Sequence, residues 1–174
     1  MRLFVGCDLP DHLVSYLRFL SEQLPEAVLV VPRQYDLTLK FLGSIRIEQY
    51  DEIVRRLSLV SFQPFDVWCD HISFFSEKHI RVVWLALSPK EPIQALHHAI
   101  SEVLSPSFPD TKLFVPHITL ARVKSVKRKA EFIRSINRIE VEKKALHVDR
   151  FSLVRSEQGE RGVFHKKLYE FCAR

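Results

Sequence analysis

Glycine is scarce in this chain of 174 residues, which has only four, and no low-complexity stretch accompanies them. The sequence therefore offers no long flexible linker between folded parts. It also lacks any apolar run near the ~20 residues that a helix needs to cross a bilayer. The N-terminus reads as a first strand because it lacks the long apolar core of a signal peptide. We therefore expect a protein that has no membrane segment and resides in the cytoplasm.

Cysteine is also sparse. Cys7, Cys69 and Cys172 lie far apart, form no C-x-x-C pair and are odd in number. Buried apolar thiols in a reducing compartment explain this distribution better than a disulfide or a metal site. The sequence thus predicts no metal and no cofactor.

Charge is unbalanced toward the positive. The formal net charge is +5 and the isoelectric point is near 9.2, which favours a polyanionic partner. A basic run, Lys124 to Lys129, contains Lys127 and Arg128. It could be an ordinary solvated helix face, or it could guide an RNA backbone, in which case binding would depend on salt.

Hydrophobic periodicity predicts alternating helices and strands, interrupted by hairpins. With 47% hydrophobic residues the chain can bury a sizeable core. We expect an α+β fold with largely antiparallel sheet, forming a single domain over residues 1–174. The predicted helices are 10–20, 48–60, 92–104 and 126–136. The predicted strands are 28–31, 36–42, 65–75 (with an internal break), 79–87, 117–123, 145–155 and 162–171, the last two joined by a loop over 156–161.

One strand-like segment occurs twice, about half a chain length apart. The sequence His117-Ile118-Thr119-Leu120 matches Asp36-Leu37-Thr38-Leu39, and a predicted helix follows each copy. Such a duplication predicts two similar lobes related by a pseudo-twofold axis, with the two strands facing a central cleft.

Side chains alternate along a strand, so each copy should present one polar face. We expect His117, Thr119 and Ala121 on one side of the second copy, and Asp36, Thr38 and Lys40 on one side of the first. Imidazole can accept or donate a proton, and threonine hydroxyls can donate to phosphoryl oxygens. Two histidines flanking a phosphorus atom would suffice for phosphodiester hydrolysis without a metal.

The chain resembles the 2H phosphoesterase superfamily, specifically the RNA 2′,3′-cyclic phosphodiesterases formerly called 2′-5′ RNA ligases. The resemblance covers nearly the whole chain. It rests on residues 2–6 (RLFVG), 37–43 (LTLKFLG), 81–84 (RVVW), 114–124 (FVPHITLARVK) and 151–156 (FSLVRS).

The resemblance implies two α/β lobes whose H-x-T motifs face each other across a groove. It implies hydrolysis of a terminal 2′,3′-cyclic phosphate of RNA to a 2′-phosphate, with some members joining or cleaving 2′-5′ linkages. His117 then matches the proton acceptor, and Thr38 and Thr119 the phosphate-binding threonines. Arg122 matches a recurrent family arginine and is counted with the substrate-binding residues. Because strict alternation points it away from His117, we expect it to support the groove. We also expect a monomer.

Asp36 stands where the family has its proton-donating histidine. Carboxyl groups of aspartate ordinarily titrate near ~3.9, so they are ionised at neutral pH and repel a phosphodiester. Loss of a general acid typically costs about 10²–10⁴-fold in rate. Three outcomes stay open: impaired catalysis, rescue by apolar burial that keeps the carboxyl protonated, or a non-catalytic module that binds RNA ends or nucleotides.

Overall fold

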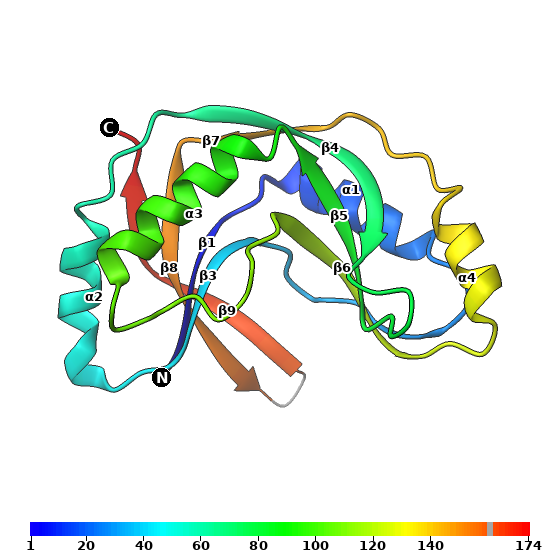
Figure 1. Cartoon of the computed structure of the whole chain (residues 1–174), viewed down its shortest axis with the longest axis horizontal. Coiled ribbons are helices and arrows are strands. Elements are labelled where there is room, and N and C mark those ends of the chain that lie inside the picture. Colours follow the sequence, from blue (N-terminus) through cyan, green and yellow to red (C-terminus); the bar gives the residue numbers. More distant parts are fainter. Residues whose placement is uncertain (160–161) are drawn as a thin grey trace.

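The structure, a computed structural model, describes residues 1–159 and 162–174. It contains two antiparallel sheets (Figure 1). One sheet has the order β3-β1-β8-β9, formed by Leu37–Ser44, Arg2–Cys7, Arg150–Gly159 and Gly162–Cys172. The other has the order β2-β6-β5-β4-β7, formed by Val28–Val30, His117–Ser125, Val82–Ser88, Phe65–Phe74 and Ala145–Val148. The predicted α+β class with antiparallel sheets is confirmed.

Helices cover each sheet, and a helix from one half of the chain packs on the motif strand of the other half. Helices α1 (Asp11–Glu22) and α3 (Glu91–Leu104) each bury an apolar stripe at helical spacing. The first-half helix α1 packs on β6, whereas the second-half helix α3 packs on β3. Helix α2 (Tyr50–Leu57), entered through the short helix η1 (Ile47–Gln49), packs on α3, and α4 (Lys129–Ile136) follows β6 (Figure 1).

Two predicted elements need correction. The single strand expected over 145–155 is two strands, β7 and β8, which belong to different sheets and separate at Asp149. The loop expected over 156–161 is shorter, because β8 continues to Gly159; residues 160–161 lie outside the described residues. The predicted break inside 65–75 is confirmed as a register shift between Cys69 and Ile72 in the β4–β5 hairpin.

The cysteines are all free. Cys7 and Cys69 are buried, as expected, and burial raises the pKa of the Cys69 thiol to about 11. Cys172 is exposed, so the expectation of a buried thiol is wrong for this residue. It occupies the last position of β9, where the strand reaches the surface.

Both motif strands contain a β-bulge at the same place. In β3 the pairing with β1 skips Leu39, and in β6 the pairing with β5 skips Leu120. A bulge places two residues opposite one and so reverses the alternation of faces beyond it. Strict alternation therefore holds up to the threonine of each motif and fails after it. As a result Lys40 is buried and Phe41 exposed, the reverse of the arrangement expected.

The bulge in β3 is held from the side of α3. The His97 imidazole donates from Nδ1 to the Leu39 carbonyl oxygen, at 2.8 Å. The ammonium of Lys40 donates to the Ser101 hydroxyl at 3.1 Å and forms an ion pair with the Asp110 carboxylate. Partial burial disfavours the charged form of Asp110, but the bonds from Lys40 and Ser101 outweigh it and lower the carboxyl pKa. A polar cluster thus fixes the backbone next to Thr38.

Candidate functional site

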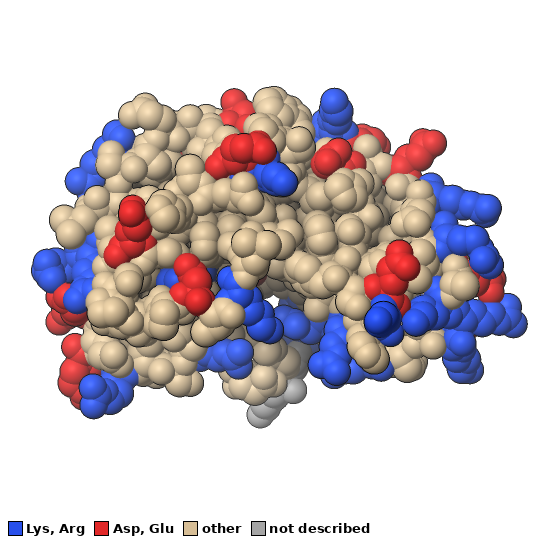
Figure 2. All heavy atoms as spheres, viewed as in Figure 1, with Lys and Arg blue, Asp and Glu red and all other residues tan. Residues whose placement is uncertain are grey.

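The two motif strands approach each other from different sheets, as the repeat predicted. Asp36 immediately precedes β3, and His117 is the first residue of β6. The negative charge of Asp36 acts on His117 and favours its protonated form, so the two side chains lie within electrostatic reach of each other. Thr38 and Thr119 follow on the same side of their strands, and both are half-buried. Figure 2 shows a hollow near the middle of the molecule, with basic side chains at its rim.

The surroundings of His117 favour its uncharged form. Its ring lies edge-on to Phe75, with centroids 5.1 Å apart, and 5.7 Å from the ring of Trp84. Burial lowers the pKa of His117 below its ordinary 6.5 and outweighs the opposing bond to Val115 and the charge of Asp36. With Nδ1–H donating to the Val115 carbonyl at 2.7 Å, Nε2 is the nitrogen left to accept a proton.

Arg122 lies nearer the site than the sequence indicated. The bulge at Leu120 changes the phase of β6, so that Ala121 is buried and Arg122 is exposed. The positive charge of Arg122 contributes to lowering the pKa of His117, which places the guanidinium in the electrostatic field of the site. The bulge at Leu120 thus breaks the strict alternation on which the expectation for Arg122 rested.

Asp36 is held in a polar setting. Its Oδ2 accepts a hydrogen bond of 2.5 Å from the Thr38 hydroxyl, and its Oδ1 lies 3.4 Å from Nδ1 of His165. Both oxygens of Asp36 therefore face polar groups, whereas the rescue of a proton donor considered above depends on apolar burial. The hydroxyl expected to bind phosphate is instead engaged by the carboxylate.

His165, on β9, was missed by sequence reasoning. The fold pairs His165 with Asp36 at 3.4 Å and His147 with Asp66 at 2.7 Å. No motif surrounds His165, so no sequence signal could have identified it. Its imidazole and the Asp36 carboxylate line one pocket of about 160 Å³, together with Phe4.

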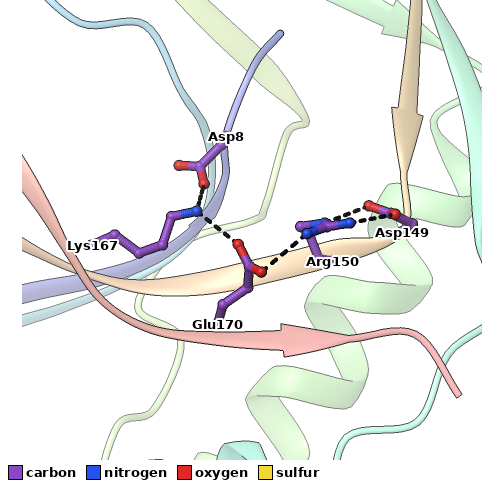
Figure 3. A network of polar contacts seen from close by, with 5 residues as sticks. All are labelled: Asp8, Asp149, Arg150, Lys167 and Glu170. Atoms are coloured by element: carbon purple, nitrogen blue, oxygen red, sulfur yellow. Dashed lines mark hydrogen bonds and ion pairs between the residues drawn. The ribbon is translucent and has the colours of Figure 1, made fainter.

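A network of ion pairs ties the strand of His165 to its neighbours (Figure 3). The Lys167 ammonium, which also lines the pocket, lies 2.5 Å from the Asp8 carboxylate and 2.7 Å from that of Glu170. Glu170 contacts Arg150 at 3.1 Å, and Arg150 contacts Asp149 at 2.9 Å. Two carboxylates share the Lys167 ammonium, so this side chain anchors β9 to β1 and is poorly placed to hold a phosphate.

Basic side chains gather beyond the second motif. Lys124, Lys127, Arg128 and Lys129 are all exposed. Figure 2 shows blue side chains concentrated at the end of the molecule that carries α4. A long-range positive field of this kind attracts polyanions.

Within residues 1–159 and 162–174, no three side chains of His, Cys, Asp or Glu are arranged to hold a metal ion. In the same residues no helix has the length and apolarity to cross a membrane.

Comparisons with known proteins identify the family and the fold. The profile of the 2′-5′ RNA ligase superfamily matches residues 29–160. The chain is 27% identical to an RNA 2′,3′-cyclic phosphodiesterase of Methanothermobacter thermautotrophicus over 98% of both chains. It is 32% identical to one of Archaeoglobus fulgidus, over 71% of this chain and 73% of the relative.

Solved structures show the same fold. TT0787 of Thermus thermophilus superposes with a TM-score of 0.77 and 27% identity, covering 100% of this chain and 98% of that one. LigT of E. coli complexed with 3′-AMP superposes with a TM-score of 0.80, covering 99% and 97% at 21% identity. The chain therefore belongs to the 2′-5′ RNA ligase superfamily of 2H phosphoesterases.

Proposed function

We propose that this chain is an RNA 2′,3′-cyclic phosphodiesterase that opens a terminal cyclic phosphate to leave a 2′-phosphate, using protein side chains alone. One observation carries the proposal: His117, packed against Phe75 and Trp84 with Nδ1 bonded to the Val115 carbonyl, opens strand β6, which contacts the first motif strand β3. The relatives named as RNA 2′,3′-cyclic phosphodiesterases support the same reaction.

The proposed step is an in-line displacement at phosphorus. Nε2 of His117 takes a proton from water, and the water oxygen bonds to phosphorus as the bond to the 3′-oxygen breaks. Thr119 donates a hydrogen bond to a non-bridging oxygen and Arg122 stabilises the charge there, while Thr38 contributes less because its hydroxyl donates to Asp36. With the 5′-hydroxyl of a second RNA in place of water, the same groups would join a 2′-5′ linkage and release the 3′-hydroxyl.

Asp36 limits this reaction in two ways. Its negative charge repels the phosphodiester, and its Oδ2 occupies the Thr38 hydroxyl. We therefore expect turnover slower than that of a member with two motif histidines, by up to the 10²–10⁴-fold that general acids contribute.

A short RNA bearing a 2′,3′-cyclic phosphate tests the proposal. Incubation with the chain should give a 2′-phosphate, distinguished from a 3′-phosphate by chromatography against standards and from the cyclic form by its added water in mass spectrometry. Binding of this RNA without any product would contradict the proposal. It would instead identify a module that binds RNA ends without catalysis.

A further inference from the structure

The proposed reaction needs a group that protonates the leaving 3′-oxygen, and the motif position holds Asp36, whose Oδ2 accepts a hydrogen bond from Thr38 and whose Oδ1 faces His165. We propose that His165 supplies this proton to the leaving 3′-oxygen, with Asp36 orienting its ring. This assignment rests on the proposed phosphodiesterase function and names the acid that the function requires.

The position of His165 favours this role. Its Nδ1 lies 3.4 Å from Oδ1 of Asp36, while Thr38 occupies Oδ2 of the same carboxylate. Imidazole, carboxylate and hydroxyl therefore form one chain of polar groups. Catalytic contacts are often long without substrate and shorten when it binds.

The ring is also held in place. Its plane meets that of Phe4 edge-on, with centroids 4.8 Å apart, and the backbone N–H of His165 donates to the Gln34 side chain at 2.5 Å. Two residues along, Lys167 fixes the strand to Asp8. Because Nδ1 faces Asp36, Nε2 is the ring nitrogen left for a ligand.

The partner at Nδ1 distinguishes the two histidines. His117 donates to a neutral carbonyl inside an apolar shell, an arrangement suited to an uncharged base. Nδ1 of His165 faces the Asp36 carboxylate instead of a carbonyl. The site then contains an acid and a base that differ in what their Nδ1 atoms face.

Other histidine–aspartate pairs do not share this setting. The side chains of His147 and Asp66 are 59% and 53% exposed, so water screens the pair. For His165 and Asp36 the figures are 25% and 21%, and both line the pocket. The partial burial and the pocket, rather than the pairing itself, point to a role in chemistry.

The step is balanced. Water loses a proton to Nε2 of His117 and its oxygen bonds to phosphorus, while the bond from phosphorus to the 3′-oxygen breaks and that oxygen takes a proton from Nε2 of His165. The ribose then carries a 2′-phosphate and a 3′-hydroxyl. Proton exchange with water returns both histidines to their starting states.

A double-mutant cycle tests the assignment. His165→Gln should lower kcat on the cyclic-phosphate RNA by at least about 100-fold in the natural background. In the Asp36→His background, where the motif histidine is restored, the same change should cost less than about threefold, because the restored histidine donates the proton. His147→Gln, which removes the exposed histidine of the other pair, should leave both rates unchanged.

A structural role for His165 would give equal losses in both backgrounds, and that result would overturn the assignment. As a second readout, imidazole added to His165→Ala should restore part of the rate, and absence of any rescue would count against a donor. Failure of the unaltered chain to form 2′-phosphate would overturn the proposed function. Turnover that His165→Gln leaves unchanged would overturn the donor role alone.

Discussion

The first and second motif strands share a backbone design but differ in chemistry. Each carries a bulge directly after its Thr-Leu pair. In β6 the motif begins with a histidine packed against Phe75 and Trp84, whereas in β3 it begins with an aspartate bonded to its own threonine. The bulges return different side chains to the exposed side, Arg122 in one strand and Phe41 in the other.

The comparison distinguishes the residues that hold the backbone of the first motif from the residue that would take part in its chemistry. The bulge in β3 is kept by Lys40, His97 and Asp110, none of which depends on the identity of residue 36. A change from histidine to aspartate can therefore alter the chemistry of the first motif while its backbone stays in place. Proton donation can then pass to a side chain from another strand.

The largest expected effect lies in the second motif. His117→Gln should lower kcat/KM on cyclic-phosphate RNA by about 10³-fold or more, because its ring combines a lowered pKa with one nitrogen left to accept a proton. Single-turnover kinetics would measure the loss. A reduction of less than tenfold would show that His117 is not the base.

The two threonines should differ next. Thr119→Val should cost about 10²-fold in kcat/KM, the effect of losing one donor to a charged oxygen. Thr38→Val should cost less than about tenfold, because its hydroxyl already donates to Asp36. Equal losses would show that the Thr38 hydroxyl turns to the substrate and would contradict the difference between the motifs.

Stability should respond to the polar cluster of the first motif. Asp110→Asn leaves the ammonium of Lys40, whose side chain is 3% exposed, without a charged partner. We expect about 2 kcal/mol of destabilisation in urea unfolding, reduced from the cost of a fully buried pair because Asp110 is partly solvated. Asp66→Asn, at an exposed pair, should change stability by less than about 0.5 kcal/mol.

The same pair has a pH signature. The folded-state pKa of Asp110 lies below its ordinary value of 3.8. Its stabilisation is therefore present above that value and is lost as the pH falls through the lower folded-state pKa. Asp110→Asn should lose less stability than the natural chain over that acid range.

The smallest expected effect is a displacement of the pH–rate profile. His117 must be unprotonated to accept a proton, so activity should rise with pH through its lowered pKa, below 6.5. Phe75→Ala should expose the His117 ring and remove part of the burial that lowers its pKa. The pKa of His117 should then rise, and the rising limb of the pH–rate profile should shift to higher pH. Arg122→Gln should do the same. If the rising limb of the profile does not move in either variant, it reflects the titration of a group other than His117.

Local pattern predicted most of the elements, because helices and strands that bury one face carry that periodicity in sequence. Helix α3 and the β4–β5 hairpin were predicted within a few residues. The division of residues 145–155 between two sheets at Asp149 was not predicted, because β7 and β8 form one continuous strand-forming stretch in the sequence.

Within the site, the residues up to each threonine were predicted, and those beyond it were not. A bulge is set by pairing with a partner strand, so Lys40 and Arg122 could not be placed by alternation alone. The contact of His165 with Asp36 could not be predicted from the sequence for a further reason. It meets Asp36 only because β9 and the segment before β3 come together in the folded molecule.

The way the halves interleave governs how the chain could be divided. Strand β2 pairs only with β6 among the described strands, and β8 completes the sheet begun by β1. A break in the turn between β4 and β5 would leave each fragment with exposed apolar strand edges and an uncovered sheet face. Neither fragment would fold alone, whereas the two mixed together should reassemble by complementation and recover one cooperative unit.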